Sequence, residues 1–306
     1  MNNSELLFLY DAKMTNPNGN VDDENRPRMD YDTRRNLVSD VRLKRYVRDY
    51  LNWQGKPLYV GEVNGKTVNA EQRLEALFEQ YPGKVDKKSW NAEIERWMLE
   101  QLIDVRLFGA TMAVKGNALA YTGPVQFTWG YSLNPVRLME STITTHFSST
   151  GTQEQGTMGK DYRVVYSFLA FYGQVSGRRA ERTGMTEDDL LLLDEAMVKS
   201  IPLVSSRSKI GQTPRLYMRV EYGDDMTMIG DWREQLTALP EGLIQIDEVL
   251  LPANRLFAKL EEVKHRIHRI YLWQDNDLRW SSADGEGNFA SLMPSSLRDK
   301  TEYLKL

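Results

Sequence analysis

Apolar runs with the composition of β-strands occur at six places along the chain. They are rich in leucine, β-branched and aromatic residues, and Gly, Pro, Asn or Asp residues interrupt the sequence between them. The run at 162–176 is long and predicts a central strand. The predicted strands are residues 5–14, 104–116, 123–133, 162–176, 214–222 and 267–274.

Apolar residues at helical spacing predict four helical regions, at 33–51, 70–104, 186–202 and 252–266. Asp32 or Thr33 can cap the first of them, and Thr186 with Asp189 approximates a capping box. Between the first two, the pair Asn64-Gly65 predicts a small hairpin.

Three further segments have neither pattern. Residues 140–161 are polar and rich in Thr, Ser and Gly, which indicates an exposed segment that is either flexible or forms a β-hairpin arm. Residues 223–252 are acidic and irregular, and the chain after the last predicted strand is expected to be tail-like. The order of elements resembles the split βαβ pattern of ferredoxin-like or RNA-recognition folds, an arrangement that does not by itself decide function.

The composition excludes several classes of protein and of functional site. The chain has 306 residues, is 41% hydrophobic and contains no cysteine. Disulfides, thiolate metal sites, iron–sulfur clusters and cysteine nucleophiles are therefore excluded, and a reducing cytoplasm is expected. The apolar run near the N-terminus, Leu6 to Tyr10, is too short for a signal peptide or a membrane span.

The positive charge of this acidic chain is concentrated in three places. The formal net charge is −4. Basic residues nevertheless outnumber acidic ones by eight to three in 26–48, by five to two in 156–182 and by four to none in 205–219. Clusters of this kind on an acidic body favour a localised groove for a polyanion over three separate solvated surfaces.

Three other kinds of chemistry are weaker candidates. The sequence 61–67 ends in Gly-Lys-Thr but is one residue short of a P-loop and lies in a predicted hairpin, so a turn is the better interpretation. Carboxylates crowd the loop after the first strand, where interleaved arginines favour ion pairs over a metal site. The histidines His146, His265 and His268 have no evident third ligand or nucleophile.

The basic segment 33–51 is predicted to be an amphipathic helix. Rotation by about 100° per residue places Leu43, Tyr46, Val47, Tyr50 and Leu51 on one face for the core. The same rotation gathers Arg34, Lys44, Arg45 and Arg48 on a separate face. Lys44 and Arg48 are alike in charge and four residues apart, which is unfavourable if they are unpaired and favours a phosphate backbone as their partner.

Two loops carry chemistry that suits phosphate. The sequence 156–160 offers flexible backbone N–H groups, a hydroxyl and a lysine, and 205–209 offers serines with two cations. No RNP motif with its aromatic residues is evident, so contacts to the nucleic-acid backbone rather than base stacking are expected.

Several blocks together resemble a known family. They are "NPNGNVDDENRPRMD", "TRRNLVSDVRLKRYVRDYL", "DVRLFGATM", "GPVQFTWGYSLNPV", "TMGKDYRVVYSFLAFYG" and "SSR". In this order they closely resemble the backbone subunit of type I CRISPR Cascade surveillance complexes, the Cas-seven family, in its I-B or I-C branch. The blocks extend from residue 16 to about 207, some two thirds of the chain.

The resemblance implies an α+β fold in which a modified RNA-recognition (ferredoxin-like) palm carries a helical finger insertion and a β-hairpin thumb. The palm with C-terminal additions corresponds to 1–54, 105–135 and 162–306, the finger to 55–104 and the thumb arm to 136–161. The implied partners are CRISPR guide RNA, target DNA paired to the guide, further copies of the chain and other Cascade subunits. No catalytic residue, cofactor, metal or membrane contact is implied.

The residues assigned to RNA binding are Asn18, Asn20, Arg34, Arg35, Lys44, Arg45, Arg48, Lys115, Thr157, Met158, Lys160, Ser205, Ser206, Arg207 and Lys209. Two alternatives stay open. One is a metal-dependent, RNA-cleaving backbone subunit that uses a loop aspartate, as in type III relatives, with Asp22, Asp23, Asp30 or Asp32 as the candidate. The other is a free-standing RNA-binding protein.

Overall fold

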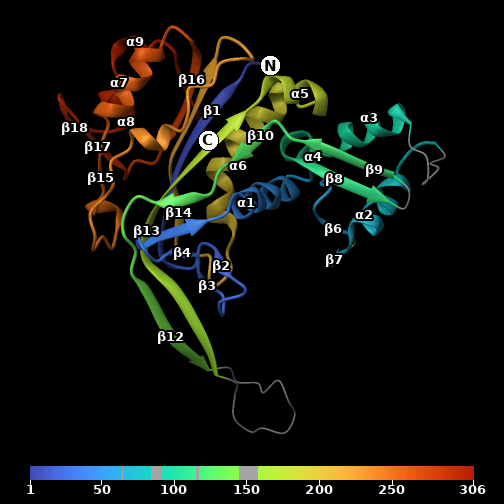
Figure 1. The fold of residues 1–306 in the computed structure, drawn as a ribbon, viewed down its shortest axis with the longest axis horizontal. Helices are drawn as coiled ribbons and strands as arrows, with labels where there is room; N and C mark the ends of the chain where they lie inside the picture. Colours follow the sequence, from blue (N-terminus) through green and yellow to red (C-terminus); the bar gives the residue numbers. More distant parts are fainter. Residues whose placement is uncertain (64, 84–90, 115–116, 145–157) are drawn as a thin grey trace.

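The centre of the protein is an antiparallel sheet with the strand order of a split βαβ fold (Figure 1). The computed structural model describes residues 1–63, 65–83, 91–114, 117–144 and 158–306. Four strands lie side by side in the order β14 (Gln212–Tyr222), β1 (Ser4–Thr15), β13 (Met158–Val175) and β11 (Gly130–Ser132). Along the chain these are the fourth, first, third and second of the four strands, and helices pack on the sheet, so the predicted α+β class is confirmed.

Two helices pack on one face of this sheet. Helix α1 (Asp40–Trp53) follows β1, and α6 (Glu187–Leu203) follows β13. Alternate residues of β1, including Leu6, Phe8 and Tyr10, point into the core that these helices cover. The buried residues of α1 are those that the helical rotation predicts for its core face. Helix α6 begins with the predicted capping box between Thr186 and Asp189.

The opposite face of the sheet is covered by the C-terminal third of the chain. Leu7 and Leu9 of β1 pack there, in one core with Trp280, Phe289 and Leu297. The prediction of a tail after residue 274 is therefore wrong. The short elements there lack a long periodic pattern but still bury large side chains. The elements of this cover are η1 (Trp232–Gln235), η2 (Ile246–Glu248), β15 (Leu250–Pro252), α7 (Asn254–Val263), β17 (Arg279–Ser282), β18 (Gly285–Gly287), α8 (Phe289–Leu292) and α9 (Ser295–Arg298). The central sheet itself continues beyond β14 with β16 (Ile267–Gln274), which the sequence predicted, and β19 (Thr301–Tyr303).

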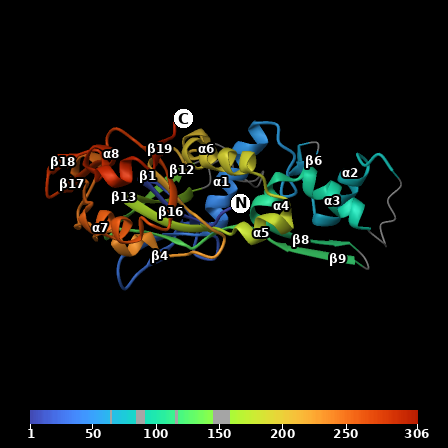
Figure 2. The ribbon, with the colours of Figure 1, turned by 90° about the horizontal axis from the view of Figure 1, so that it is seen from above.

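A third core lies in a separate lobe, which Figure 2 shows at the end of the molecule opposite the C-terminal elements. We call this part, residues 55–122, the finger lobe. The predicted strand at 104–116 is wrong in its first half, which is helical. Helix α2 contributes Leu74 and α3 contributes Met98 to this core. The elements are β6 (Glu62–Val63), β7 (Lys66–Thr67), α2 (Ala70–Phe78), α3 (Ala92–Gln101), α4 (Ile103–Phe108), β8 (Gly109–Val114) and β9 (Asn117–Thr122).

The segment between β1 and α1 differs most from the prediction. Residues expected in the first turns of the helix form a strand between β11 and β4 instead, and Ser39 caps the helix by accepting a hydrogen bond from the backbone N–H of Arg42 at 3.2 Å. Arg34 has a φ of 55°, which is incompatible with a helix. The strands here are β2 (Gly19–Asn20), β3 (Arg26–Pro27), β4 (Met29–Asp30) and β5 (Arg35–Val38).

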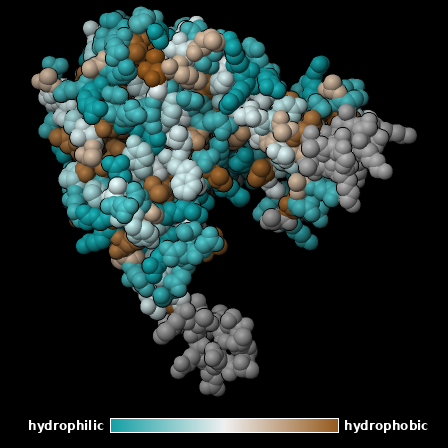
Figure 3. All heavy atoms as spheres, viewed as in Figure 1, coloured by the Kyte–Doolittle hydropathy of each residue, from teal (hydrophilic) through white to brown (hydrophobic). Residues whose placement is uncertain are grey.

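A two-stranded ribbon projects from the body in Figure 1. It consists of β12 (Leu138–Thr144) paired with the first part of β13, in a register from Leu138 opposite Val164 to Thr144 opposite Met158. The described surface of the ribbon is largely hydrophilic (Figure 3). The remaining elements are β10 (Val125–Phe127), which with β11 replaces the single strand predicted at 123–133, and α5 (Gly177–Thr183).

The C-terminal cover supplies a stability prediction. Trp280→Ala is expected to lower the free energy of unfolding by about 3–5 kcal/mol, because a fully buried indole is replaced by a cavity. Urea unfolding followed by circular dichroism measures this change. Trp53→Ala is the matched control, since that side chain is 53% exposed and its loss is expected to cost about 0.5 kcal/mol or less. Equal losses in the two variants would contradict a core role for the C-terminal residues.

Candidate nucleic-acid interface

Three segments that are distant in the sequence meet where β1 ends. The backbone N–H of Asn16 donates to the carbonyl of Ser208 at 3.0 Å, and the hydroxyl of Thr15 donates to the same oxygen at 2.6 Å. Arg207 forms an ion pair with Asp161 of β13 at 3.2 Å. We call the surface formed by 13–28, 160–163 and 205–210, together with Arg42, the junction surface.

Positive side chains predominate on the junction surface. Its carboxylates include Asp23, Glu24 and Asp161, with Glu140 of β12 beside them. Its cations are Lys13, Arg26, Arg28, Arg42, Lys160, Arg163, Arg207 and Lys209. The structure thus brings together parts of all three basic clusters that the sequence separates.

Asn18 and Asn20 shape the loop after β1 through their backbone and side-chain oxygens. The side-chain carbonyl of Asn18 accepts hydrogen bonds from both the N–H and the hydroxyl of Ser39, each at 2.9 Å. The backbone carbonyl of Asn20 accepts from the N–H groups of Asp23 and Asn25 at 3.1 and 2.8 Å. The first contact fixes where α1 begins, and the second closes the turn between β2 and β3.

An exposed charge network joins this loop to β13. Glu24 accepts hydrogen bonds from the hydroxyl of Tyr162 at 2.6 Å and from the ammonium group of Lys160 at 3.3 Å. The guanidinium of Arg26 stacks over the Tyr162 ring, 4.5 Å from its centroid. Hydrogen bonds from Tyr162 and Lys160 lower the pKa of the Glu24 carboxyl. Lys160 keeps about half of its side chain exposed to solvent, at 51%.

Lys209 is held inward by the same loop. Its ammonium group donates to the backbone carbonyls of Asn16 and Pro17, and burial together with the nearby Arg42 lowers its pKa to about 7. The ammonium group is therefore directed at the backbone, where it fastens the loop after β1 to the loop after α6. Ser205 and Ser206, by contrast, are exposed on this second loop.

The cations on helix α1 have acidic partners, contrary to the sequence interpretation. Lys44 pairs with Asp40 at 3.2 Å, and Arg45 pairs with Asp49 at 2.7 Å. Both pairs have i,i+4 spacing, which is a signal present in the sequence. Arg48 pairs at 3.0 Å with buried Asp104, 56 residues away, which no local pattern reveals.

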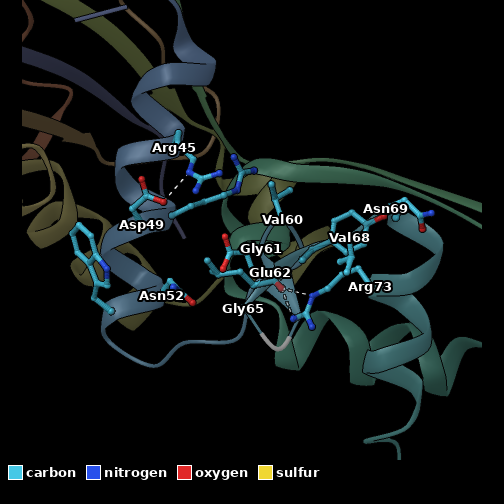
Figure 4. Close-up of a pocket in the computed structure, with 15 residues that line it drawn as sticks. Arg45, Asp49, Asn52, Val60, Gly61, Glu62, Gly65, Val68, Asn69 and Arg73 are labelled. Carbon is cyan, nitrogen blue, oxygen red and sulfur yellow. Dashed lines mark hydrogen bonds and ion pairs between the residues drawn. The ribbon is translucent and has the colours of Figure 1, made fainter. Parts of the chain in front are cut away.

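Arg45 and Arg48 line a cleft between α1 and the finger lobe, not the junction surface (Figure 4). The cleft has a volume of about 660 Å³. On its far side the guanidinium of Arg73 donates to the carbonyl of Leu58 at 2.9 Å through Nε. Exposed Trp53 lies at the end of α1 that borders this cleft.

The remaining assigned residues lie apart from the junction surface or outside the described chain. Arg34 forms a two-pronged ion pair with Glu241, at 2.5 and 2.8 Å. Arg35 stacks over Tyr131 at 5.1 Å. Lys115 and Thr157 fall outside the described residues, and Met158 is described only by its backbone pairing with Thr144. Sequence reasoning did not assign Arg26, Arg28, Arg42 or Arg163 to RNA binding. The partners of Arg26, Arg28 and Arg163 become adjacent only on folding, whereas the i,i+4 pair of Arg42 with Tyr46 is a signal present in the sequence.

The carboxylates of the loop after β1 do not converge. Asp30 accepts hydrogen bonds from the hydroxyl and N–H of Thr33, and Asp23 lies 3.8 Å from Arg26. Among the described residues no group of three or more His, Cys, Asp or Glu side chains is placed to hold a metal ion. His265 and His268 are both exposed, and the Gly-Lys-Thr sequence belongs to the turn and strand of the β6–β7 hairpin.

Comparison with known proteins identifies the family. The sequence model described as "CRISPR-associated protein Cas7" matches residues 2–239. The chain belongs to this family. A CRISPR-associated protein Cas7 from Haloferax volcanii is 33% identical to it over 307 residues, covering 93% of this chain and 90% of the relative.

Solved structures share the fold of this family member. A chain of a CRISPR RNA-guided surveillance complex superposes with a TM-score of 0.56 at 16% identity, covering 99% of this chain and 95% of that one. A chain of such a complex described as pre-nicking gives 0.57 at 14% identity, with coverage of 99% and 96%. In the described part of this family member, no helix combines the length and apolarity needed to cross a membrane.

The buried ammonium group of Lys209 predicts a pH-dependent stability. Because its pKa is lower in the folded chain than in the unfolded one, the unfolded chain binds more protons above pH 7. The contribution of Lys209 to the free energy of unfolding is thus expected to rise between pH 7 and 9, by up to about 1.4 kcal/mol per pH unit.

Urea unfolding at pH 7, 8 and 9 measures this contribution as the difference between the unmodified chain and Lys209→Met. The same difference for Lys56→Met, a change at an exposed lysine, is expected to stay constant. A constant difference for Lys209→Met as well would show that its ammonium group titrates as in water.

Proposed function

We propose that this family member is a non-catalytic backbone subunit that binds CRISPR guide RNA through the junction surface and presents the guide for pairing with target DNA. The observation that carries this proposal is the meeting of three basic segments around the end of β1, in a chain of the Cas7 family. The contacts are mostly to phosphate, because cations and serine hydroxyls dominate the surface. The protein acts in the cytoplasm, together with other Cascade subunits.

Assembly along the guide is the second part of the proposal. The β12–β13 ribbon begins at the junction surface, where Lys160 contacts Glu24, and it is the proposed thumb. Its polar surface suits contact with RNA and with a neighbouring copy rather than packing in a core. Size-exclusion chromatography with guides of increasing length tests this: each added guide segment is expected to recruit a further copy. One copy on guides of every length would favour a free-standing RNA-binding protein instead.

The phosphate contacts predict a change in salt dependence. Replacing Lys160 and Arg207 together by Ala is expected to weaken RNA binding by a similar factor for unrelated sequences. It is also expected to reduce the slope of log K against log salt by roughly 0.7 for each phosphate group that the protein no longer neutralises. Fluorescence anisotropy between 50 and 300 mM salt measures both quantities. Arg45→Ala, a change at an equally exposed and ion-paired arginine of the α1 cleft, is the control with an expected unchanged slope.

RNA cleavage is the competing activity. With complementary RNA and Mg²⁺, the assembled complex is expected to leave the target intact, because the loop carboxylates are dispersed. Gel analysis of labelled target RNA checks this. Regularly spaced cuts that disappear in the Asp23→Ala or Asp30→Ala variant would replace the non-catalytic assignment by a metal-dependent nuclease.

A further inference from the structure

The turn between β2 and β3, beside the start of the ribbon in Figure 1, places an acidic side chain over cations of the junction surface. The hydroxyl of Tyr162 and the ammonium group of Lys160 donate hydrogen bonds to one atom, Oε2 of Glu24, at 2.6 and 3.3 Å. The guanidinium of Arg26 lies 3.9 Å from the same oxygen. Within the described chain this carboxylate has no other hydrogen bond or ion pair, and its side chain is 57% exposed. Three donors therefore converge on a single anionic oxygen that solvent can reach.

Two of the three donors are held in place by contacts other than those to Glu24. Tyr162 is only 5% exposed, and its hydroxyl accepts a hydrogen bond from the guanidinium of Arg26 at 3.1 Å. The same guanidinium stacks over the Tyr162 ring. The hydroxyl proton is therefore directed at the position that Oε2 of Glu24 occupies. An oriented hydroxyl, a guanidinium and an ammonium group are donors that proteins use for phosphate oxygens.

The backbone of the turn holds the carboxylate over these donors in a rarely adopted conformation. Glu24 and Asn25 have φ angles of 47° and 60°, in the left-handed region that residues other than glycine seldom occupy. Asn25 is fixed there, because its carbonyl accepts a hydrogen bond from the side-chain amide of Asn16 at 2.7 Å. Its side chain packs against Gly19, where an added Cβ would lie 1.9 Å from Oδ1 of Asn25. The side chain of Glu24 takes no part in these contacts, so its carboxylate can rotate away while the turn stays in place.

A carboxylate in this position can act in two opposite ways on a bound polyanion. It can position the cations, in which case RNA binding needs it, or it can compete with phosphate for the same donors. The structure favours competition, because burial fixes Tyr162 and stacking fixes Arg26 without the help of Glu24. One oxygen of a phosphate group is an anionic acceptor like Oε2, and the two cannot occupy the same position at once.

We propose that Glu24 is an internal competitor of RNA: its carboxylate occupies one phosphate position of the junction surface and leaves that position when RNA binds. The inference rests on the proposed RNA binding and adds a regulation of that site. Because the competitor is part of the chain, it lowers the affinity of every copy for any polyanion by the same factor. A polyanion must engage the remaining cations of the surface, such as Arg207, to offset this factor.

RNA binding by Glu24→Gln tests the proposal, because the amide keeps the size of the side chain and removes its charge. The variant is expected to bind single-stranded RNA about three- to five-fold more tightly, the range that an exposed ion pair allows, whatever the RNA sequence. The gain is expected to shrink as salt rises, because salt screens exposed charges. Fluorescence anisotropy between 50 and 300 mM salt measures both effects.

Two controls separate competition from a general change in charge. Glu302→Gln removes the same charge from the exposed ion pair with Arg269 at the β19 edge of the central sheet, and it is expected to leave RNA affinity unchanged. In a chain that already carries Lys160→Ala, Glu24→Gln is expected to give a smaller gain, because one of the groups for which the carboxylate competes is absent. Urea unfolding is expected to give the same midpoint for Glu24→Gln as for the unmodified chain.

Four results would overturn the proposal. A lower affinity of Glu24→Gln would show that the carboxylate positions the cations, and an unchanged affinity would show that it occupies no phosphate position. A gain matched by Glu302→Gln would come from net charge alone, and a gain that Lys160→Ala does not reduce would not come from this site. In all four cases the unmodified chain still binds RNA, so the proposed function stands. Absence of RNA binding in every variant and in the unmodified chain would overturn both.

Discussion

Burial of the central strands on both faces is the constraint on which the rest of the structure depends. In β1 every residue from Ser4 to Ala12 is buried, and only Lys13 and Met14 near its end are exposed. The polar residues among them need internal partners. Glu5 accepts hydrogen bonds from Tyr172, Tyr222 and the N–H groups of Ile229 and Gly230, so it binds the cover to the sheet. With both faces closed, a surface for RNA can form only at the ends and edges of the strands.

The need for internal partners also explains why many of the cationic side chains have a structural role, as partners of buried carboxylates. The finger lobe is attached to α1 and α6 through buried charged groups: Asp104 accepts hydrogen bonds from Arg48 and from the N–H groups of Tyr59 and Val60. Arg106 in turn donates to both oxygens of Asp189 and to the carbonyl of Leu99. Loss of one partner in such a buried pair costs about 3–5 kcal/mol, because a charge is left without compensation. These arginines therefore position the lobes.

Local patterns predicted the features that depend on neighbouring residues. The apolar face of α1, the capping box of α6 and the central position of β13 follow from spacing and composition within one segment. In the C-terminal third, α7 and β16 match the predicted helix at 252–266 and strand at 267–274. The elements after β16 were missed because they are only a few residues long, and they bury Trp280 and Phe289 through tertiary contacts. For the site, residue types indicated a polyanion as the ligand, which stays a prediction, whereas only folding determines which carboxylate each arginine meets.

The strength of each ion pair then separates the cations that can exchange a carboxylate for a phosphate from those that cannot. The pairs Lys160–Glu24 and Arg207–Asp161 leave both cations more than half exposed. Lys160–Glu24 is an exposed pair, and such pairs contribute about 0–1 kcal/mol, so a phosphate can replace the carboxylate at little cost. Asp161 is only 11% exposed, but it keeps Arg163 as a partner at 2.8 Å when Arg207 turns to a phosphate. Arg48, only 13% exposed and bound to a buried carboxylate, would have to leave that carboxylate unpaired. Net charge is thus a poor guide to this interface, because what matters is how firmly each cation is already held.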